Sequence, residues 1–236
     1  MNAPPPREAF AGPPAPPGPE PPVDPSWSVL LDDPLFAVVA KSGNLPCHPS
    51  GRYRAHTLDA LLRAAGWAAV HFVSRLDKGT TGLMLVAKSG YAHELMKRRQ
   101  HTADFYREYL AVAEGIVTPA SGTIDAPIGL EEGSSYRHSV RSDGAKSLTV
   151  YETLSVANGR TLLRLLPQTG RTHQLRVHMA HLGYPLTGDW LYGTRSDAID
   201  RPALHSHRLV FQHPLTGEQL DLLSPLPNDM KALIMD

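Results

Sequence analysis

The chain has 236 residues, of which 42% are hydrophobic, and this is enough to bury a substantial core in one large domain or two small ones. Its 23 basic and 23 acidic side chains give a formal net charge of zero, which taken alone argues weakly against a nucleic-acid partner. The single cysteine, Cys47, excludes an internal disulfide, and no run of 18 apolar residues is present to form a transmembrane helix. We therefore expect a soluble, cytoplasmic protein.

Residues 1–25 differ in composition from the rest of the chain. They hold half of the 22 prolines and almost no large aliphatic residue. A segment of this kind cannot bury enough apolar surface to offset the entropy lost on ordering, so the sequence predicts a disordered tail. The segment has neither the basic region nor the apolar region of a secretory signal. Residues 26–236 are then expected to form a single folded domain.

The elements predicted for this domain do not follow a regular strand–helix–strand order. In chain order they are strands over 29–31 and 35–40, a helix over 58–65, a strand over 83–87, a helix over 90–99, strands over 109–113, 149–154 and 161–166, a helix over 172–182 and a strand over 208–212. Thr57 and Ser89 are expected to cap the first two helices. Many strands and few helices predict an α+β fold with a mixed, largely antiparallel sheet and flanking helices.

The most informative segment is residues 73–83, VSRLDKGTTGL, which places one acidic residue on a turn before an apolar strand. A carboxylate can attack a sugar C1′ if it is ionised, lies beneath the sugar and is shielded from water. Apolar neighbours would raise the pKa of Asp77, and a nearby guanidinium would oppose this rise. The candidate partners are Arg75, Arg171 and Arg176. On this segment alone, a catalytic role for Asp77 and a turn-capping role have about equal weight.

A second dense block, TGRTHQLRVH, covers residues 169–178. Together, the two blocks resemble the RluA-type pseudouridine synthases, which isomerise uridine in RNA, and the resemblance runs from about Ser28 to about Leu226. It implies the pseudouridine synthase catalytic fold, with no metal and no cofactor. Many relatives carry an S4 RNA-binding domain before the catalytic domain, and here only the proline-rich tail stands in that place. The chain thus resembles the compact members that act on tRNA, or on both tRNA and rRNA.

The resemblance also implies roles for particular residues. Asp77 matches the nucleophilic aspartate, and Arg176 matches the arginine that pairs with it. Tyr109 is similar in setting to a pocket tyrosine that is structural or acts in proton abstraction, and Tyr106 is the alternative if the register differs. In the implied reaction Asp77 attacks C1′ or assists its cleavage by another covalent route, and the detached uracil turns and rejoins through C5.

Four further residues are expected to bind the substrate. Arg75 resembles the arginine that helps to fill the gap left when the uridine leaves its stack, which is necessary because C1′ and C5 are inaccessible in stacked RNA. Leu204 resembles the apolar residue that packs near the flipped base. Arg171 and His173, in the second block, complete the expected substrate-binding set.

The sequence departs from the family pattern at two places. Ser74 stands immediately before R-L-D, where the family usually has histidine. The geometry of this loop can therefore differ from that of other family members, which does not exclude activity. The early K-P-x-G stretch is Lys41-Ser42-Gly43-Asn44 here, without the proline.

Three other functions agree with parts of the sequence. A zinc hydrolase would use histidines, but His173 and His178 are five residues apart, on different sides of a helix, and no HExxH or CxxC motif is present. A nucleoside or glycoside hydrolase would need an acid about 5 Å from Asp77, and neither block contains one. The third is a non-catalytic RNA-binding module that retains the fold, against which the set of Asp77, Tyr109 and Arg176 argues.

Basic residues gather in segments 52–56, 97–107 and 137–146, although the net charge is zero. Each cluster alone is typical of solvated loops and helix ends. Because the three flank the two motif blocks, they favour a local track for RNA phosphates. The sequence does not identify the target RNA, because site choice depends on the shape of the RNA and on dispersed contacts. Nothing in it demands more than a monomer, and no membrane partner is expected.

Overall fold

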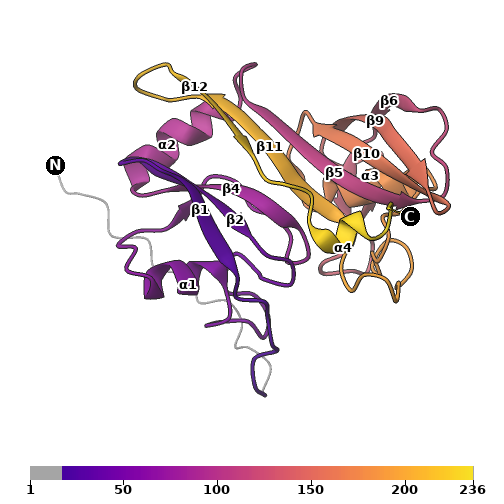
Figure 1. The fold of residues 1–236 in the computed structure, drawn as a ribbon, viewed down its shortest axis with the longest axis horizontal. Helices are drawn as coiled ribbons and strands as arrows, with labels where there is room; N and C mark the ends of the chain where they lie inside the picture. The colour runs from indigo at the N-terminus through magenta and orange to yellow at the C-terminus, as the bar shows by residue number, and fades with distance from the viewer. Residues whose placement is uncertain (1–17, 236) are drawn as a thin grey trace.

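The computed structural model describes residues 18–235 and contains one large sheet (Figure 1). Its main path runs β1-β2-β4-β11-β5-β10-β9-β6, while β3 pairs with β4 and β12 pairs with β11. The strands are β1 (Trp27–Asp32), β2 (Phe36–Lys41), β3 (His71–Phe72), β4 (Thr81–Ala87), β5 (Tyr106–Glu114), β6 (Ser121–Asp125), β9 (Leu148–Ala157), β10 (Arg160–Pro167), β11 (Leu204–Gln212) and β12 (Gln219–Leu223). A separate hairpin joins β7 (Ile128–Leu130) to β8 (His138–Val140).

The predicted fold class is confirmed. In the described part of the chain every strand pair is antiparallel except β4 beside β11. The helices are α1 (Leu58–Ala64), α2 (Gly90–Arg99), α3 (Gln174–His181) and α4 (Asn228–Lys231). In Figure 1, α1 and α2 lie with β1, β2 and β4, whereas α3 lies with β9 and β10, and the long strands β11 and β5 join these two halves. None of these helices is long and apolar enough to cross a membrane.

Strands β2 and β4 are buried on both faces. Because a strand directs successive side chains to opposite sides, alternate residues of both strands pack against α1 and the intervening residues pack against α2. The first set is Ala37, Val39, Met84 and Val86, and the second is Phe36, Val38, Leu83, Leu85 and Ala87. This arrangement explains why residues 83–87 form a continuous apolar run, and it gives the turn before β4 a rigid base.

Helix caps were predicted more accurately than short strands. The Thr57 and Ser89 side chains accept hydrogen bonds from backbone amides three residues onward, as expected. The third helix begins at Gln174 rather than at 172, because His173 has a left-handed backbone with φ of 57°. Strands β3, β6, β7, β8 and β12 were not predicted. They are short, and β12 alternates exposed and half-buried residues, so none has a strong apolar run.

Residues 18–25 follow the surface of the domain, unlike the disordered tail predicted for residues 1–25. The Glu20 carboxylate accepts hydrogen bonds from the amides of Ala55 and His56, at 2.9 and 2.8 Å. These backbone hydrogen bonds lower the pKa of Glu20 to about 2. Side chains of the domain also donate to backbone carbonyls of this segment, at Pro19, Pro22 and Asp24. Polar contacts thus hold a segment that has little apolar surface of its own, and composition alone did not reveal this. Residues 1–17 lie outside the described residues.

Candidate active site

Asp77 lies on the turn between β3 and β4, and its side chain is 27% exposed. Arg176 comes from α3, in the other half of the sheet, and its Nη1 donates a hydrogen bond to Asp77 Oδ2 at 3.1 Å. The predicted contact between these two residues, 99 positions apart, is therefore present. Arg75 and Arg171, the other two arginines considered, make no hydrogen bond or ion pair with Asp77 within residues 18–235.

A second carboxylate, which the sequence analysis did not identify, holds Arg176 from its buried side. Asp189 Oδ2 accepts from Arg176 Nε at 2.7 Å, and Asp189 Oδ1 accepts from Arg176 Nη2 at 2.8 Å. The Asp189 side chain is fully buried and that of Arg176 is 8% exposed. A bidentate pair of this kind fixes the plane of the guanidinium. Arg176 is thus held in one orientation, with its remaining donor Nη1 directed at Asp77.

The two carboxylates that flank Arg176 favour its charged form. Burial opposes the positive charge of Arg176, but the hydrogen bonds and charges of Asp189 and Asp77 outweigh it and raise the pKa of Arg176. The arginine therefore stays charged at every physiological pH. Of the two carboxylates that contact this arginine, Asp189 is fully buried and Asp77 is 27% exposed, so Asp77 is the one that faces solvent.

His173 lies beside Asp77 and contacts Tyr192, a second residue absent from the predicted site. The Tyr192 hydroxyl accepts from the backbone amide of His138 at 3.0 Å and lies 2.7 Å from His173 Nδ1. Burial lowers the pKa of His173, although Asp77 acts in the opposite direction, so the neutral imidazole dominates at neutral pH. With the Tyr192 hydroxyl donating to Nδ1, the proton of the ring lies on Nε2, which is 3.9 Å from Asp77 Oδ2.

Tyr109 lies on the face of β5 that is directed to the site. It packs between the core cluster that contains Leu76 and the one that contains Leu204. Burial raises the pKa of Tyr109, with Asp77 acting in the same direction, so its hydroxyl is protonated at neutral pH. Tyr106 is three residues earlier and lies on the opposite face of the strand, where its hydroxyl donates to Glu108 at 2.8 Å. The register of β5 thus brings Tyr109, and not Tyr106, close to Asp77.

The remaining predicted residues form the rim and the base of the site. Leu204 is buried at the start of β11. Arg75 and Arg171 are exposed, and Arg171 Nε donates to the carbonyl of Lys146 at 3.1 Å. Gln174, a further residue that was not predicted, holds the block that contains Arg171. Its buried Oε1 accepts from the Arg171 amide at 3.0 Å and from the Thr169 hydroxyl at 2.7 Å.

Two of the alternative functions agree poorly with these contacts. His178 is buried and bonds Thr149 and the carbonyl of Ala126, so it is directed away from His173. Asp189 shares the partner Arg176 with Asp77, but both oxygens of Asp189 bind this arginine. A general acid must be free to donate its proton, whereas Asp189 is engaged with Arg176 through both oxygens. Among residues 18–235 no group of side chains that could hold a metal ion is found.

Comparisons with known proteins identify the family of the chain. The model of a family described as RNA pseudouridylate synthase matches residues 36–181, which include the turn of Asp77 and the whole of α3. The chain belongs to this family. The match confirms the RluA-type resemblance drawn from the two motif blocks and identifies the protein as an RNA pseudouridine synthase.

Several members of the family are similar along most of the chain. YjbO of Bacillus subtilis, named as an uncharacterized RNA pseudouridine synthase, is 43% identical over 211 residues, which cover 87% of this chain and 75% of that protein. The ribosomal large subunit pseudouridine synthase D of Vibrio cholerae is 38% identical over 227 residues, which cover 88% and 70% of the two chains. The structure of human RNA Pseudouridylate Synthase Domain Containing 1 has a TM-score of 0.70 and 29% identity, and covers 87% of this chain and 86% of its own.

Proposed function

We propose that this pseudouridine synthase converts uridine to pseudouridine at a specific site in structured RNA, with Asp77 as the attacking carboxylate. The observation that carries the proposal is the arrangement of Asp77, Arg176 and Asp189. Arg176 is held by a buried carboxylate on one side and donates to a partly exposed carboxylate on the other. Only Oδ2 of Asp77 accepts from Arg176, and Oδ1 makes no hydrogen bond with the described residues. One oxygen is thus used for orientation and the other remains available to the sugar.

The chemistry follows from this geometry. Asp77 Oδ1 attacks C1′, the C1′–N1 bond breaks, and the uracil leaves with the bonding electrons. The uracil turns within the pocket, C5 attacks C1′, and the carboxylate is released. Loss of the C5 proton and protonation of N1 give pseudouridine. Water must be excluded meanwhile, because hydrolysis of the sugar ester would leave an abasic site. Tyr109 and Leu204 are suited to this exclusion, since both lie in the apolar clusters beside the turn.

The substrate uridine must leave its stack before Asp77 can reach C1′. We assign this step to Arg75, which is exposed two residues before Asp77, where its guanidinium can occupy the space left by the flipped base. Arg171 is exposed on the loop before α3 and is suited to a phosphate. The RNA is tRNA, rRNA or both, and the name of the Vibrio cholerae relative favours rRNA as the first substrate to test. Action in the cytoplasm, as a monomer, is part of the same proposal.

The test compares wild type, Asp77→Asn and Asp221→Asn on total tRNA and rRNA that lack pseudouridine. Pseudouridine is mapped by its chemical adduct and primer extension. Asp221, on β12, is the matched control, because it is also an aspartate paired with an arginine, Arg208 of β11, and it makes no contact with the Asp77–Arg176 cluster among the described hydrogen bonds. We expect one or a few modified sites with wild type and Asp221→Asn, and none with Asp77→Asn. Modification by Asp77→Asn would refute the role of Asp77. Folded wild type that binds RNA but modifies no uridine would instead favour the binding module.

A further inference from the structure

The turn that carries Asp77 is held by its backbone. Each of its four carbonyls, at residues 76–79, accepts a hydrogen bond. The donors are the Cys47 thiol to Leu76, the Thr80 amide to Asp77, the Leu45 amide and Lys41 Nζ to Lys78, and Arg201 Nη1 to Gly79. Apart from Thr80, all of these donors come from outside the turn. The position of Asp77 therefore depends on segment 41–47 and on Arg201.

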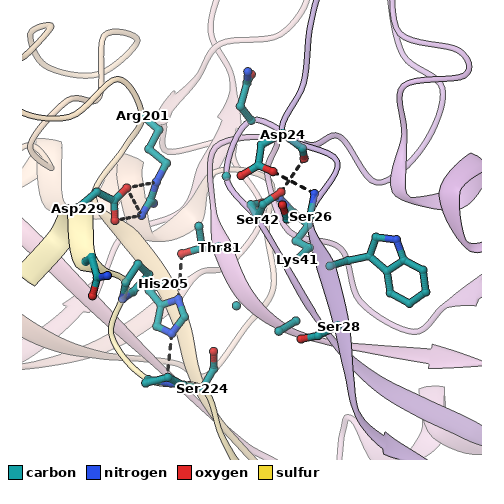
Figure 2. A pocket seen from close by; sticks show the side chains of 18 of the residues that line it. Asp24, Ser26, Ser28, Lys41, Ser42, Thr81, Arg201, His205, Ser224 and Asp229 are labelled. Carbon is teal, nitrogen blue, oxygen red and sulfur yellow. Dashed lines mark hydrogen bonds and ion pairs between the residues drawn. The ribbon is translucent and has the colours of Figure 1, made fainter.

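Arg201 connects this turn to α4 near the C-terminus (Figure 2). Its guanidinium is 6% exposed, and Nε and Nη2 bind the two oxygens of Asp229 at 2.8 and 2.9 Å. The third nitrogen, Nη1, donates to the carbonyls of Gly79 and Leu204 at 3.3 Å and of Pro202 at 3.1 Å. One side chain thus ties the turn of Asp77 to the start of β11, where the candidate pocket residue Leu204 lies.

Two glycines, which have no side chain, allow Arg201 and Pro202 to pack closely against the backbone. A Cβ atom on Gly43 would lie 2.5 Å from Arg201 Cδ. A Cβ atom on Gly79 would lie 2.8 Å from Pro202 Cδ and 3.6 Å from Arg201 Cβ. Contacts shorter than about 3 Å require displacement of the neighbour, here a buried arginine and its adjoining proline. The glycine of the early Lys41-Ser42-Gly43-Asn44 stretch is therefore explained by the packing of Arg201.

The cleft beside Arg201 has a volume of about 680 Å³ and is lined by Lys41, Arg201 and Asp229, among others, but not by Asp77 (Figure 2). Its cations are already engaged: Lys41 Nζ donates to the carbonyls of Ser42 and Lys78, and Arg201 binds Asp229. Lys41 is thus bonded to the backbone, and Arg201 to the carboxylate of Asp229. The cleft thus contains the groups that support the turn and offers no free cation to a ligand.

We propose that the Arg201–Asp229 pair positions the turn so that Asp77 meets both Arg176 and the sugar. This inference rests on the proposed function and adds two positioning residues to it. Arg176 is fixed independently by Asp189, so it cannot follow the turn if the turn moves. Replacing Arg201 removes one donor from each of three carbonyls; Pro202 keeps the Leu204 amide and Leu204 keeps the Thr81 hydroxyl, so the loss falls mainly on Gly79. Replacing Asp229, which is 40% exposed, keeps these hydrogen bonds but lets the guanidinium turn.

The test measures the kcat and KM of Arg201→Gln, Arg201→Lys and Asp229→Asn on the RNA that wild type modifies. A displacement of about 1 Å can cost a reaction about 100-fold, so we expect Arg201→Gln to lower kcat by about that factor. Arg201→Lys should restore part of the loss because it still donates to the carbonyls. KM and RNA affinity should stay at the wild-type value. The matched control is Arg208→Gln, since Arg208 forms the same bidentate contact with an aspartate on β12.

Hydrogen exchange of backbone amides, followed by mass spectrometry, gives a readout that does not need activity. Arg201→Gln and Asp229→Asn should speed exchange in residues 74–83 and leave β9 and β10 unchanged. If wild type is active and Arg201→Gln keeps its kcat, the inference is wrong. It is also wrong if Asp229→Asn speeds exchange throughout the sheet and loses activity only in proportion to unfolding. If wild type itself modifies no RNA, the proposed function fails. Unchanged exchange in residues 74–83 of Arg201→Gln would separately refute the positioning role of the Arg201–Asp229 pair.

Discussion

Replacing Asp189 by asparagine removes the charge that balances Arg176 on its buried side. The asparagine keeps one acceptor oxygen but presents an NH₂ group to a guanidinium N–H, so two donors face each other. At an effective dielectric constant of 20, two unit charges about 4 Å apart attract by about 4 kcal/mol, and both contacts to Asp189 are shorter than this. Breaking a buried pair by removing one partner costs about 3–5 kcal/mol. We expect Asp189→Asn to lose that much free energy of unfolding.

Asp77→Asn should behave in the opposite way. Asp77 is 27% exposed and contributes one hydrogen bond to the cluster, while Arg176 retains both bonds to Asp189. Because the Asp77 carboxylate is partly hydrated and Arg176 keeps its buried partner, the loss of this one contact should cost on the order of 1 kcal/mol, and the stability of this variant should stay near that of wild type. Its activity should nevertheless be lost, because the proposed attacking group is gone. Of the two carboxylates that bind Arg176, Asp189 is thus expected to stabilise the fold and Asp77 to take part in the reaction.

The two effects are measured by urea unfolding and by melting temperature, with pseudouridine formation assayed on the same samples. For a chain of this size, 1 kcal/mol corresponds to about 2–4 °C, so Asp189→Asn should melt on the order of 10 °C lower. Asp77→Asn should melt within a few degrees of wild type, as estimated from the same scale. Equal melting temperatures for the two variants, or a destabilised Asp77→Asn beside a stable Asp189→Asn, would refute this account of the cluster.

Three further predictions concern single residues. Arg176→Ala should nearly abolish turnover and cost about 3–5 kcal/mol of stability, because it leaves a buried carboxylate unpaired; full activity at an unchanged melting temperature would contradict this. Tyr106→Phe should keep wild-type kcat, whereas Tyr109→Ala should lower it by opening the pocket to water; equal kcat values for the two variants would exclude this difference. Burial lowers the pKa of His205 to about 4 from 6.5. As pH falls, His205 of the unfolded chain therefore binds a proton before His205 of the folded chain. The free energy of unfolding should be unaffected by this group above pH 6.5 and should fall by about 3 kcal/mol toward pH 4. In urea unfolding at several pH values, His205→Asn should lack this part of the fall.

Local signals in the sequence were sufficient for the elements that contain them. Thr57 and Ser89 precede amphipathic segments and cap helices, and residues 83–87 are apolar because both faces of β4 are covered. Asp77 and Arg176 could be paired because each lies in a dense motif whose resemblance to a family supplied the contact. In each case the information lies within a few adjacent residues.

Long-range contacts of single residues had no comparable signal. Asp189 lies outside both motif blocks, and only an acidic residue after a glycine in a largely apolar stretch marks it. Gly188 has a φ of 75°, and a Cβ on it would lie 2.4 Å from the carbonyl oxygen of Arg201, but neither fact is visible before the chain is folded. Glu20 likewise lies in a proline-rich segment whose composition indicates disorder. Its two hydrogen bonds reach residues 35 and 36 positions away, and they are among the contacts that hold this segment on the domain.

The Asp77 turn is held by two arginines in the same way. In each, Nε and Nη2 bind the two oxygens of an aspartate, Asp189 for Arg176 and Asp229 for Arg201. In each, Nη1 is left to donate to the turn, to the Asp77 carboxylate in one case and to a backbone carbonyl two residues later in the other. Only a planar guanidinium can bind a carboxylate with two nitrogens and direct the third elsewhere, whereas a lysine amine donates from a single point. Because the two aspartates lie on different segments of the chain, the carboxylate is located by two independent anchors, and this precision is what an attack on a single sugar carbon requires.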